Sequence, residues 1–344
     1  MTSKQKIVVP QEYYSKPVLT EHEKKTRRKV YAQKVGGRAG RIFKTLILIG
    51  LCFVILLPIF QKFSYAFRSP NDLTNPQVVW IPSEFSTANI GLAMDLLDYW
   101  PTLVRTTLLS LAIMFIQVMA SAIAGYAFAK LRFKGSNILF YLILFTLVVP
   151  NETLHVSRSL FLVNTTFFGI KLMGTVLSIF ILSAFGQGIR SAIFIYLFRQ
   201  FFRNIPAELE ESAQVDGAGV IRTFWSVMLP NARGAIVVVA LFAFVWQWND
   251  YYFARLFSIV QSYPVLAARL GEGTDRLFTV ISGWVAKGKP IFDTLTDEAL
   301  ATDPMFYGLI ANTAALLMML PLLIGYFFVQ KQFVEGIERT GITG

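Results

Sequence analysis

Long apolar stretches separated by short polar segments dominate the chain. Six of them are nearly free of charge and approach the length of about 20 residues that a membrane-crossing helix needs. They cover residues 45–61, 106–129, 135–151, 172–189 (resuming at 191–198 beyond Arg190), 234–249 and 305–330. The first follows a 44-residue leader without a small-residue cleavage site, which favours a permanent span over a signal peptide. The pattern predicts an all-α polytopic membrane protein with six transmembrane helices.

Composition supports this fold class, and the position of the charges changes its interpretation. Hydrophobic residues make up 54% of the 344 and charged residues 15%, against about 25% in soluble proteins. The net charge is +11, but residues 1–44 hold twelve Lys/Arg and only three Glu. A basic tail tethered to a membrane favours an orientation signal with contact to anionic lipid. A contact with a protein partner is the alternative, and nucleic-acid binding is not expected because no recognition motif accompanies the charge.

The basic residues also predict the orientation in the membrane. With both termini inside, the cytoplasmic segments hold 21 Lys/Arg and the external segments nine. The predicted organisation is a cytoplasmic tail (1–44), a first transmembrane helix (45–66), an external segment (67–99), a membrane core (100–331) and a cytoplasmic C-terminal tail (332–344). The core carries an external insertion at about 258–304.

Residues for catalysis or metal binding are scarce. One cysteine, Cys52, excludes a disulfide framework, and two distant histidines, His22 and His155, are too few for a histidine metal site. Residues 283–289 match G-x-x-x-x-G-K, but Pro290 stands where a phosphate loop needs Ser or Thr. We therefore expect a non-catalytic chain that binds no cofactor itself. A secondary transporter, the main rival class, would show inverted repeats and several buried ionisable groups.

Residues 204–230 are the most informative segment and predict a short helix, a glycine turn and a second short helix. Asn204 is a candidate cap, and Gly217 and Gly219 permit left-handed backbone. The first helix carries Glu208, Glu210 and Glu211 near its positive end. An interfacial helix pair on lipid headgroups is one interpretation. The acidic cluster on the cytoplasmic side instead favours a docking element for a basic protein groove, since that leaflet is anionic.

The same segment resembles a known family. Glu211-Ser212-Ala213, Asp216-Gly217-Ala218 and Leu229-Pro230 have the spacing of the EAA loop of binding-protein-dependent ABC importer permeases. The segments 126–135, 198–206, Trp248-Asn249-Asp250 and 330–336 are similar to the carbohydrate (maltose-type) branch. The resemblance covers roughly residues 45–344.

The resemblance implies a type I ABC importer transmembrane fold in a bacterial or archaeal plasma membrane. The implied partners are a homologous second permease, two ABC ATPase subunits that hold ATP and Mg²⁺, and an extracytoplasmic solute-binding protein. It further implies a carbohydrate substrate, with a non-sugar solute as the alternative. Glu208, Glu211 and the motif residues named above would couple to an ATPase, Glu211 by pairing with an arginine in the cleft of that subunit.

A second set of residues is a candidate for the translocation path. Aromatic faces and amide or carboxylate groups suit sugar hydroxyls, and Trp246, Trp248, Asn249 and Asp250 cluster near the end of the fifth span. Helix packing and an interfacial aromatic belt explain the tryptophans equally well. Arg190 lies deeper, and it either pairs with a carboxylate, lines an aqueous cavity or snorkels to the interface.

Overall fold

The computed structural model describes residues 21–69, 72, 75, 78, 80–288 and 303–341, with side chains from residue 40 onwards except at 151, 152, 155 and 337–341. The start of the basic tail, the middle of the external insertion and the last three residues therefore lie outside the described residues. The chain divides into two compact units, residues 1–60 and 61–344.

The first unit consists of most of helix α1 (Glu21–Ala66). Its apolar part, Gly40–Ala66, is long and apolar enough to cross a membrane. The helix begins well before the predicted span. Basic residues of the tail therefore continue into the apolar span within one helix, instead of forming a separate segment.

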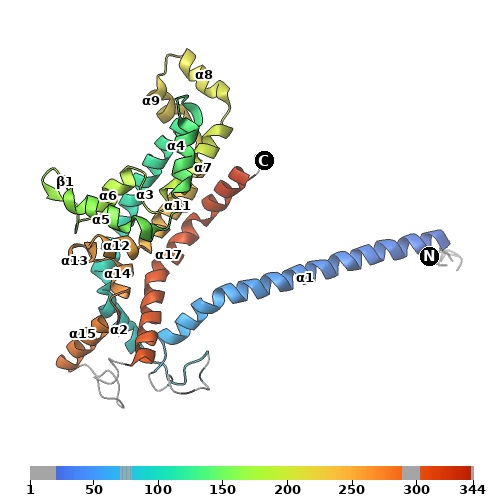
Figure 1. Ribbon diagram of the computed structural model, residues 1–344. Coiled ribbons are helices and arrows are strands. Elements are labelled where there is room, and N and C mark those ends of the chain that lie inside the picture. Colours follow the sequence, from blue (N-terminus) through green and yellow to red (C-terminus); the bar gives the residue numbers. More distant parts are fainter. Residues whose placement is uncertain are drawn as a thin grey trace, which may run out of the picture. The chain divides into compact units, whose positions relative to one another are not determined.

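The second unit is almost entirely helical (Figure 1). The sheet found in the described residues is a hairpin of two short strands, β1 (Thr166–Phe167) paired antiparallel with β2 (Ile170–Lys171). The helices are α2 (Ala88–Leu97), α3 (Tyr99–Lys130), α4 (Ser136–Phe145), η3 (Asn151–Leu154), α5 (His155–Asn164), α6 (Leu177–Ala184), α7 (Ser191–Asn204), α8 (Ala207–Val215), α9 (Val220–Thr223), η4 (Phe224–Met228), α10 (Leu229–Asn231), α11 (Arg233–Trp248), α12 (Tyr252–Leu256), α13 (Ile259–Ser262), α14 (Leu266–Leu270), α15 (Gly273–Ala286) and α17 (Pro304–Gly341).

Helices of spanning length are fewer in the described residues than the six predicted runs. Gly40–Ala66, Tyr99–Lys130 and Pro304–Gly336 are long and apolar enough, and the bent pair Val220–Asn231 with Arg233–Trp248 makes a fourth if the two are counted as one broken span. The third run contains only the ten-residue α4, and the fourth is split into α6 and α7. The split has a local cause, because Gly186 and Arg190 both have positive φ between those two helices.

Helix α3 is central to the second unit and packs against α6, α7 and α11. Its buried face is lined with small polar residues at helical spacing, including Thr102, Thr106, Ser110 and Ser121. Small residues let helix backbones approach closely in membranes, where apolar burial alone does not drive association. Thr106 is an example of this close approach. Its hydroxyl donates to the Thr102 carbonyl of the same helix (2.8 Å) and accepts from the Leu266 amide of α14 (2.9 Å).

The closest approach on this face is at Gly125. A Cβ atom placed there would lie 2.5 Å from the Phe198 Cβ and 2.9 Å from the Arg199 amide nitrogen of α7. Both are atoms fixed to the backbone of α7, so they cannot move aside as the end of a long side chain would. The two helices are therefore in near backbone contact at this point.

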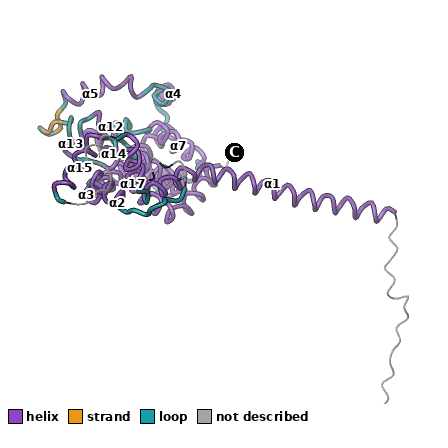
Figure 2. The backbone as a smooth tube through the Cα atoms, turned by 90° about the horizontal axis from the view of Figure 1, so that it is seen from below, coloured by secondary structure: helices purple, strands orange, loops and turns teal. Residues whose placement is uncertain are grey.

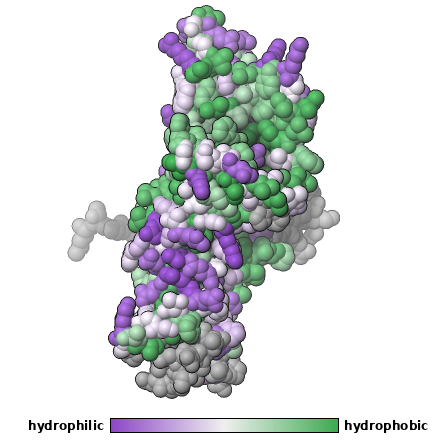
Figure 3. All heavy atoms as spheres, turned by 60° about the vertical axis from the view of Figure 1, so that its left-hand side comes forward, coloured by the Kyte–Doolittle hydropathy of each residue, from purple (hydrophilic) through white to green (hydrophobic). Residues whose placement is uncertain are grey.

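The views from other sides place the peripheral elements. Seen from below, α4 and α5 lie at the edge of the second unit, and the hairpin extends beyond α5 (Figure 2). In the space-filling view, the top, where Figure 1 places α8 and α9, mixes hydrophilic and hydrophobic side chains. A more hydrophobic surface lies beneath it, and a broader hydrophilic area lies lower still (Figure 3).

Candidate functional site

The predicted helix–turn–helix segment contains α8 and α9 and forms one end of the second unit (Figure 1). Helix α7 ends at Asn204, Ile205 is extended, and Pro206 holds the N-cap position of α8 with φ −52° and ψ 139°. The predicted helix is therefore confirmed, with Pro206 rather than Asn204 at its N-cap position. Proline fits here because it has no amide hydrogen, a group that would lack an intrahelical partner at this position.

The turn after α8 is a Schellman motif built around Gly217. Its φ is +78°, the Ala218 amide donates to the Ala213 carbonyl (2.9 Å), and the Gly217 amide donates to the Gln214 carbonyl (3.0 Å). This is the arrangement in which a left-handed residue closes a helix C-terminus. Gly219 does not share the predicted left-handed conformation, because its φ is −72° in an extended backbone.

Helix α8 presents most of its side chains to solvent, and none of its residues is buried. The predicted coupling residues Glu208, Glu211, Ser212 and Asp216 are all exposed, whereas Ala213 and Ala218 are half-buried. Exposed apolar side chains lie among them, with Val215 at 87% exposure. An exposed helix that mixes carboxylates with apolar groups is suited to docking on a complementary protein surface.

One glutamate of α8 turns inward instead. Glu210 accepts a hydrogen bond from the Tyr126 hydroxyl (3.1 Å), and its other oxygen lies 3.8 Å from Lys130 Nζ. Lys130 also donates to the Ile205 carbonyl (2.9 Å) at the junction of α7 and α8. The sequence alone places Glu210 with the other acids of α8 and singles out neither Tyr126 nor Lys130. The segment Tyr126–Gly135 resembles the family, but the spacing of its residues does not show that two of them contact a glutamate about 80 residues later.

Aromatic side chains support the base of the loop. Tyr126, Phe202 and Phe224 pack with ring centroids 5.3–6.3 Å apart. All three are buried and belong to one core cluster that continues into α11. A side chain from each of α3, α7 and the loop's second helix therefore meets beneath α8.

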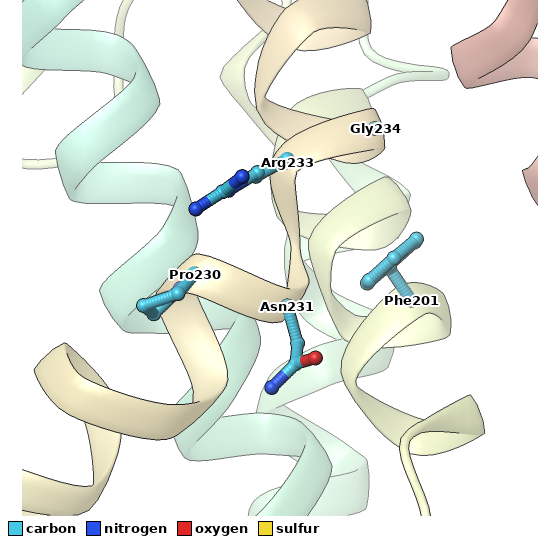
Figure 4. Close-up of a pocket in the computed structure, with 5 residues that line it drawn as sticks. All are labelled: Phe201, Pro230, Asn231, Arg233 and Gly234. Atoms are coloured by element: carbon cyan, nitrogen blue, oxygen red, sulfur yellow. The ribbon is translucent and has the colours of Figure 1, made fainter.

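The second half of the loop leads into α11 through a sharp bend. Residues 224–228 form a π-helix, and the axes of Val220–Asn231 and Arg233–Trp248 differ by 81°. Leu229 is half-buried and Pro230 exposed. Pro230 lines a hollow of about 340 Å³ with Phe201, Asn231, Arg233 and Gly234, and the Arg233 side chain extends on the same side as Pro230 (Figure 4).

The candidate path residues separate into two groups. The Arg190 guanidinium lies over the Trp246 ring, 5.0 Å from its centroid, and both side chains are at least partly accessible. Trp248 is only 2% exposed and donates to the Met318 carbonyl of α17 (3.2 Å), so packing explains it.

The polar residues after Trp248 have local roles. Asn249 is exposed and donates to the Val245 carbonyl of its own helix (2.8 Å). Asp250 is buried and accepts from the Phe253 amide (3.0 Å), which caps the start of α12. The structure thus brings Arg190 and Trp246 together and assigns Trp248 and Asp250 to internal contacts.

Comparison with known families decides the identity of the fold. Residues 117–339 match the family described as binding-protein-dependent transport system inner membrane component. The match includes α8, the Schellman turn and the bend into α11. The chain belongs to this family. The permease is therefore an inner membrane component of a binding-protein-dependent transport system.

The permease aligns with permease proteins of transport systems over nearly their whole length. The maltodextrin transport system permease protein MalD of Streptococcus pneumoniae is 28% identical over 304 residues, covering 87% of this chain and 94% of the relative. The sn-glycerol-3-phosphate transport system permease protein UgpE of Yersinia pestis is 26% identical, covering 86% and 95%. The arabinooligosaccharides transport system permease protein AraQ of Halalkalibacterium halodurans is 23% identical, covering 88% and 98%.

A solved structure shares the fold. It is a bacterial ABC transporter involved in the import of the acidic polysaccharide alginate, with a TM-score of 0.61 and 21% identity over 87% of this chain and 98% of that one. The predicted type I ABC importer fold is confirmed by this likeness together with the family match.

Proposed function

We propose that the permease forms, with a homologous second permease, the membrane path of an ABC importer for a carbohydrate. The observation that carries the proposal is the exposed acidic helix α8, closed by Gly217 in the segment whose sequence resembles the EAA loop. ATP and Mg²⁺ belong to two partner ATPase subunits, and an extracytoplasmic binding protein delivers the solute. The permease itself moves the solute and catalyses no reaction.

The coupling step follows from the exposure of α8. When α8 enters a cleft of the ATPase, Glu211 becomes buried and pairs with an arginine there. Removing one partner of a buried ion pair costs about 3–5 kcal/mol, because the other charge remains desolvated. Closure of the ATPase dimer then displaces α8, and the attached helices change the side of the membrane to which the path opens.

The six-span topology with both termini in the cytoplasm is part of the proposal. Lys/Arg asymmetry supports it. In this arrangement the short helices α4, α6 and α7 lie within the membrane as parts of the third and fourth spans. Their apolar surfaces would then be covered by lipid or by the second permease.

A carbohydrate is the proposed solute because MalD and AraQ are named for maltodextrin and arabinooligosaccharides. A phosphorylated or osmoprotective solute is the second candidate. UgpE is named for glycerol-3-phosphate, and the 26% identical GgtD of Synechocystis is named for osmoprotective compounds. The ligand preference of the cognate binding protein separates these possibilities.

The test uses the full chain assembled with its partner subunits in proteoliposomes. The tagged permease is expected to co-purify with an ATPase, and the Glu211→Gln variant should lose ATP-driven uptake while still inserting into the membrane. Replacement of Gln214, which is also exposed on α8 but uncharged, by Ala is the matched control. Normal uptake by the Glu211→Gln variant would refute the coupling role of α8.

A further inference from the structure

We infer that Tyr126, Lys130 and Glu210 form a polar latch that transmits the movement of α8 to the transmembrane helix α3. The inference rests on the proposed function, since it concerns how the docking helix is coupled to the membrane part. Lys130 and Glu210 are positioning residues in this scheme. They contact neither the solute nor ATP.

The latch joins the end of α3 to the α7–α8 segment, which follows 75–84 residues later in the sequence. Lys130 is the last residue of α3, and its ammonium group donates to the Ile205 carbonyl (2.9 Å) while lying 3.8 Å from a Glu210 oxygen. Tyr126, one helical turn earlier, donates to the other Glu210 oxygen (3.1 Å). Lys130 therefore touches both sides of the α7–α8 junction and fixes the angle at which α8 leaves α7.

The burial of these groups distinguishes the latch from an ordinary surface ion pair. The side chains of Lys130 and Glu210 are only 12% and 15% exposed, and the Tyr126 ring packs in the core against Phe202 and Phe224. Exposed pairs contribute little because water screens them. This pair is mostly shielded from water, and the hydrogen bonds from Tyr126 to Glu210 and from Lys130 to the Ile205 carbonyl fix the position of each member.

The contrast within α8 indicates why one glutamate faces inward. Glu208 and Glu211 point to solvent, where a partner would bind, whereas Glu210 faces the end of α3. The Tyr126 and Lys130 contacts to Glu210 thus connect the docking helix to α3 through polar groups. Such a connection transmits a displacement, while no residue of α8 belongs to the core clusters.

A second polar contact at the same end supports the assignment. Arg199 of α7 donates from Nε to the Phe128 carbonyl (3.2 Å), and its guanidinium lies 3.9 Å from the centroid of the Phe140 ring of α4. The C-terminal carbonyls of α3 are thus bonded to α7, while the last side chain of α3 is bonded to the α7–α8 junction. The elements meeting here are the ones through which a movement of α8 must pass.

The test compares transport with ATP hydrolysis in the reconstituted full complex. Lys130→Met and Glu210→Gln remove one charge each at similar side-chain length, and Arg132→Met, at an exposed position two residues after Lys130, is the matched control. We expect both latch variants to assemble and hydrolyse ATP. The amount of solute that they transport per ATP should be at least about fivefold lower than in the wild type, and a factor of about five is the lower end of the usual range for coupling between sites. Arg132→Met should keep the wild-type ratio, and Lys130→Arg should restore it.

Two further variants make the result specific. The double variant Lys130→Met/Glu210→Gln should be no worse than either single variant, because residues acting as one unit are not additive. Tyr126→Phe should lower the ratio less, since the Lys130 contacts remain.

The possible failures are distinguishable. If the wild-type complex shows no ATP-driven uptake, the proposed function fails. If the wild-type complex transports and the latch variants keep its transport-to-ATP ratio, the latch is refuted. It is also refuted if the variants fail to assemble with the ATPase, because the residues would then act only in folding or docking.

Discussion

The turn at Gly217 allows a quantitative prediction, because the structure separates backbone conformation from steric contact there. Gly217 has φ +78°, but a Cβ atom placed on it would meet nothing within 4 Å. A side chain at this position is therefore penalised for conformation alone. The left-handed conformation costs an L-residue about 1–2 kcal/mol, which corresponds to a factor of about 5–30 in the ratio of the closed to the open turn.

The predicted consequence is a graded loss of coupling. If the closed Schellman turn is the form that docks, the apparent affinity for the ATPase falls in proportion to its population. Gly217→Ala should therefore weaken docking, by about 5–30-fold if the open turn is already the predominant form before the substitution and by less if it is not. Gly217→Asn should weaken it less, since Asn tolerates this conformation. Gly217→Val should weaken it more, because a β-branched residue is especially disfavoured there.

The assay is the initial rate of ATP-driven uptake in proteoliposomes as the ATPase subunit is titrated. The Ala variant should reach the wild-type rate at a higher ATPase concentration, which identifies a docking defect rather than a damaged path. Gly219→Ala is the control, because Gly219 is also exposed and unobstructed but has φ −72°. Equal docking by Gly217→Ala and wild type, or Asn as weak as Val, would refute the reasoning.

Three further predictions concern packing and the candidate path. Gly125→Ala should destabilise the purified permease by about 1–3 kcal/mol in thermal unfolding, because its Cβ would overlap the backbone-fixed atoms of α7; an unchanged midpoint would contradict the close contact. Trp248→Phe should cost about 0.5–1.5 kcal/mol for the hydrogen bond to α17, also measured by unfolding, with substrate affinity unchanged. Trp246→Leu removes the ring over which Arg190 lies, and should raise the KM for uptake while leaving assembly intact; an unaltered KM would assign Trp246 to packing.

The sequence predicts the parts of this fold that depend on local pattern. Apolar length predicts α3 and α17, and the positions of Pro206 and Gly217 predict where α8 begins and ends. These features depend only on the conformational preferences of residues that are close in sequence. The same is true of the family resemblance, which depends on ordered short motifs.

The remainder depends on contacts between distant segments. Three glutamates near the start of α8 look equivalent in sequence, and only the rotation of α8 toward Lys130 selects Glu210 as the inward one. Trp246 and Trp248 are likewise two residues apart, but they face Arg190 and α17 respectively. Gly219 shows that a local pattern can also mislead. Glycine permits the left-handed backbone without requiring it, and Gly219 is extended.

The contact at Gly125 has a mechanical consequence when it is taken with the end of α3. Five residues separate Gly125 from Lys130, a distance of about 7.5 Å along a helix axis. Helix α7 touches α3 at the first point, and the α7–α8 junction touches it at the second. A body held at two separated points resists rotation about either one. In the proposed coupling, a push on α8 would therefore reach α3 as a tilt of this 32-residue helix as a whole rather than as a bend at its C-terminal end.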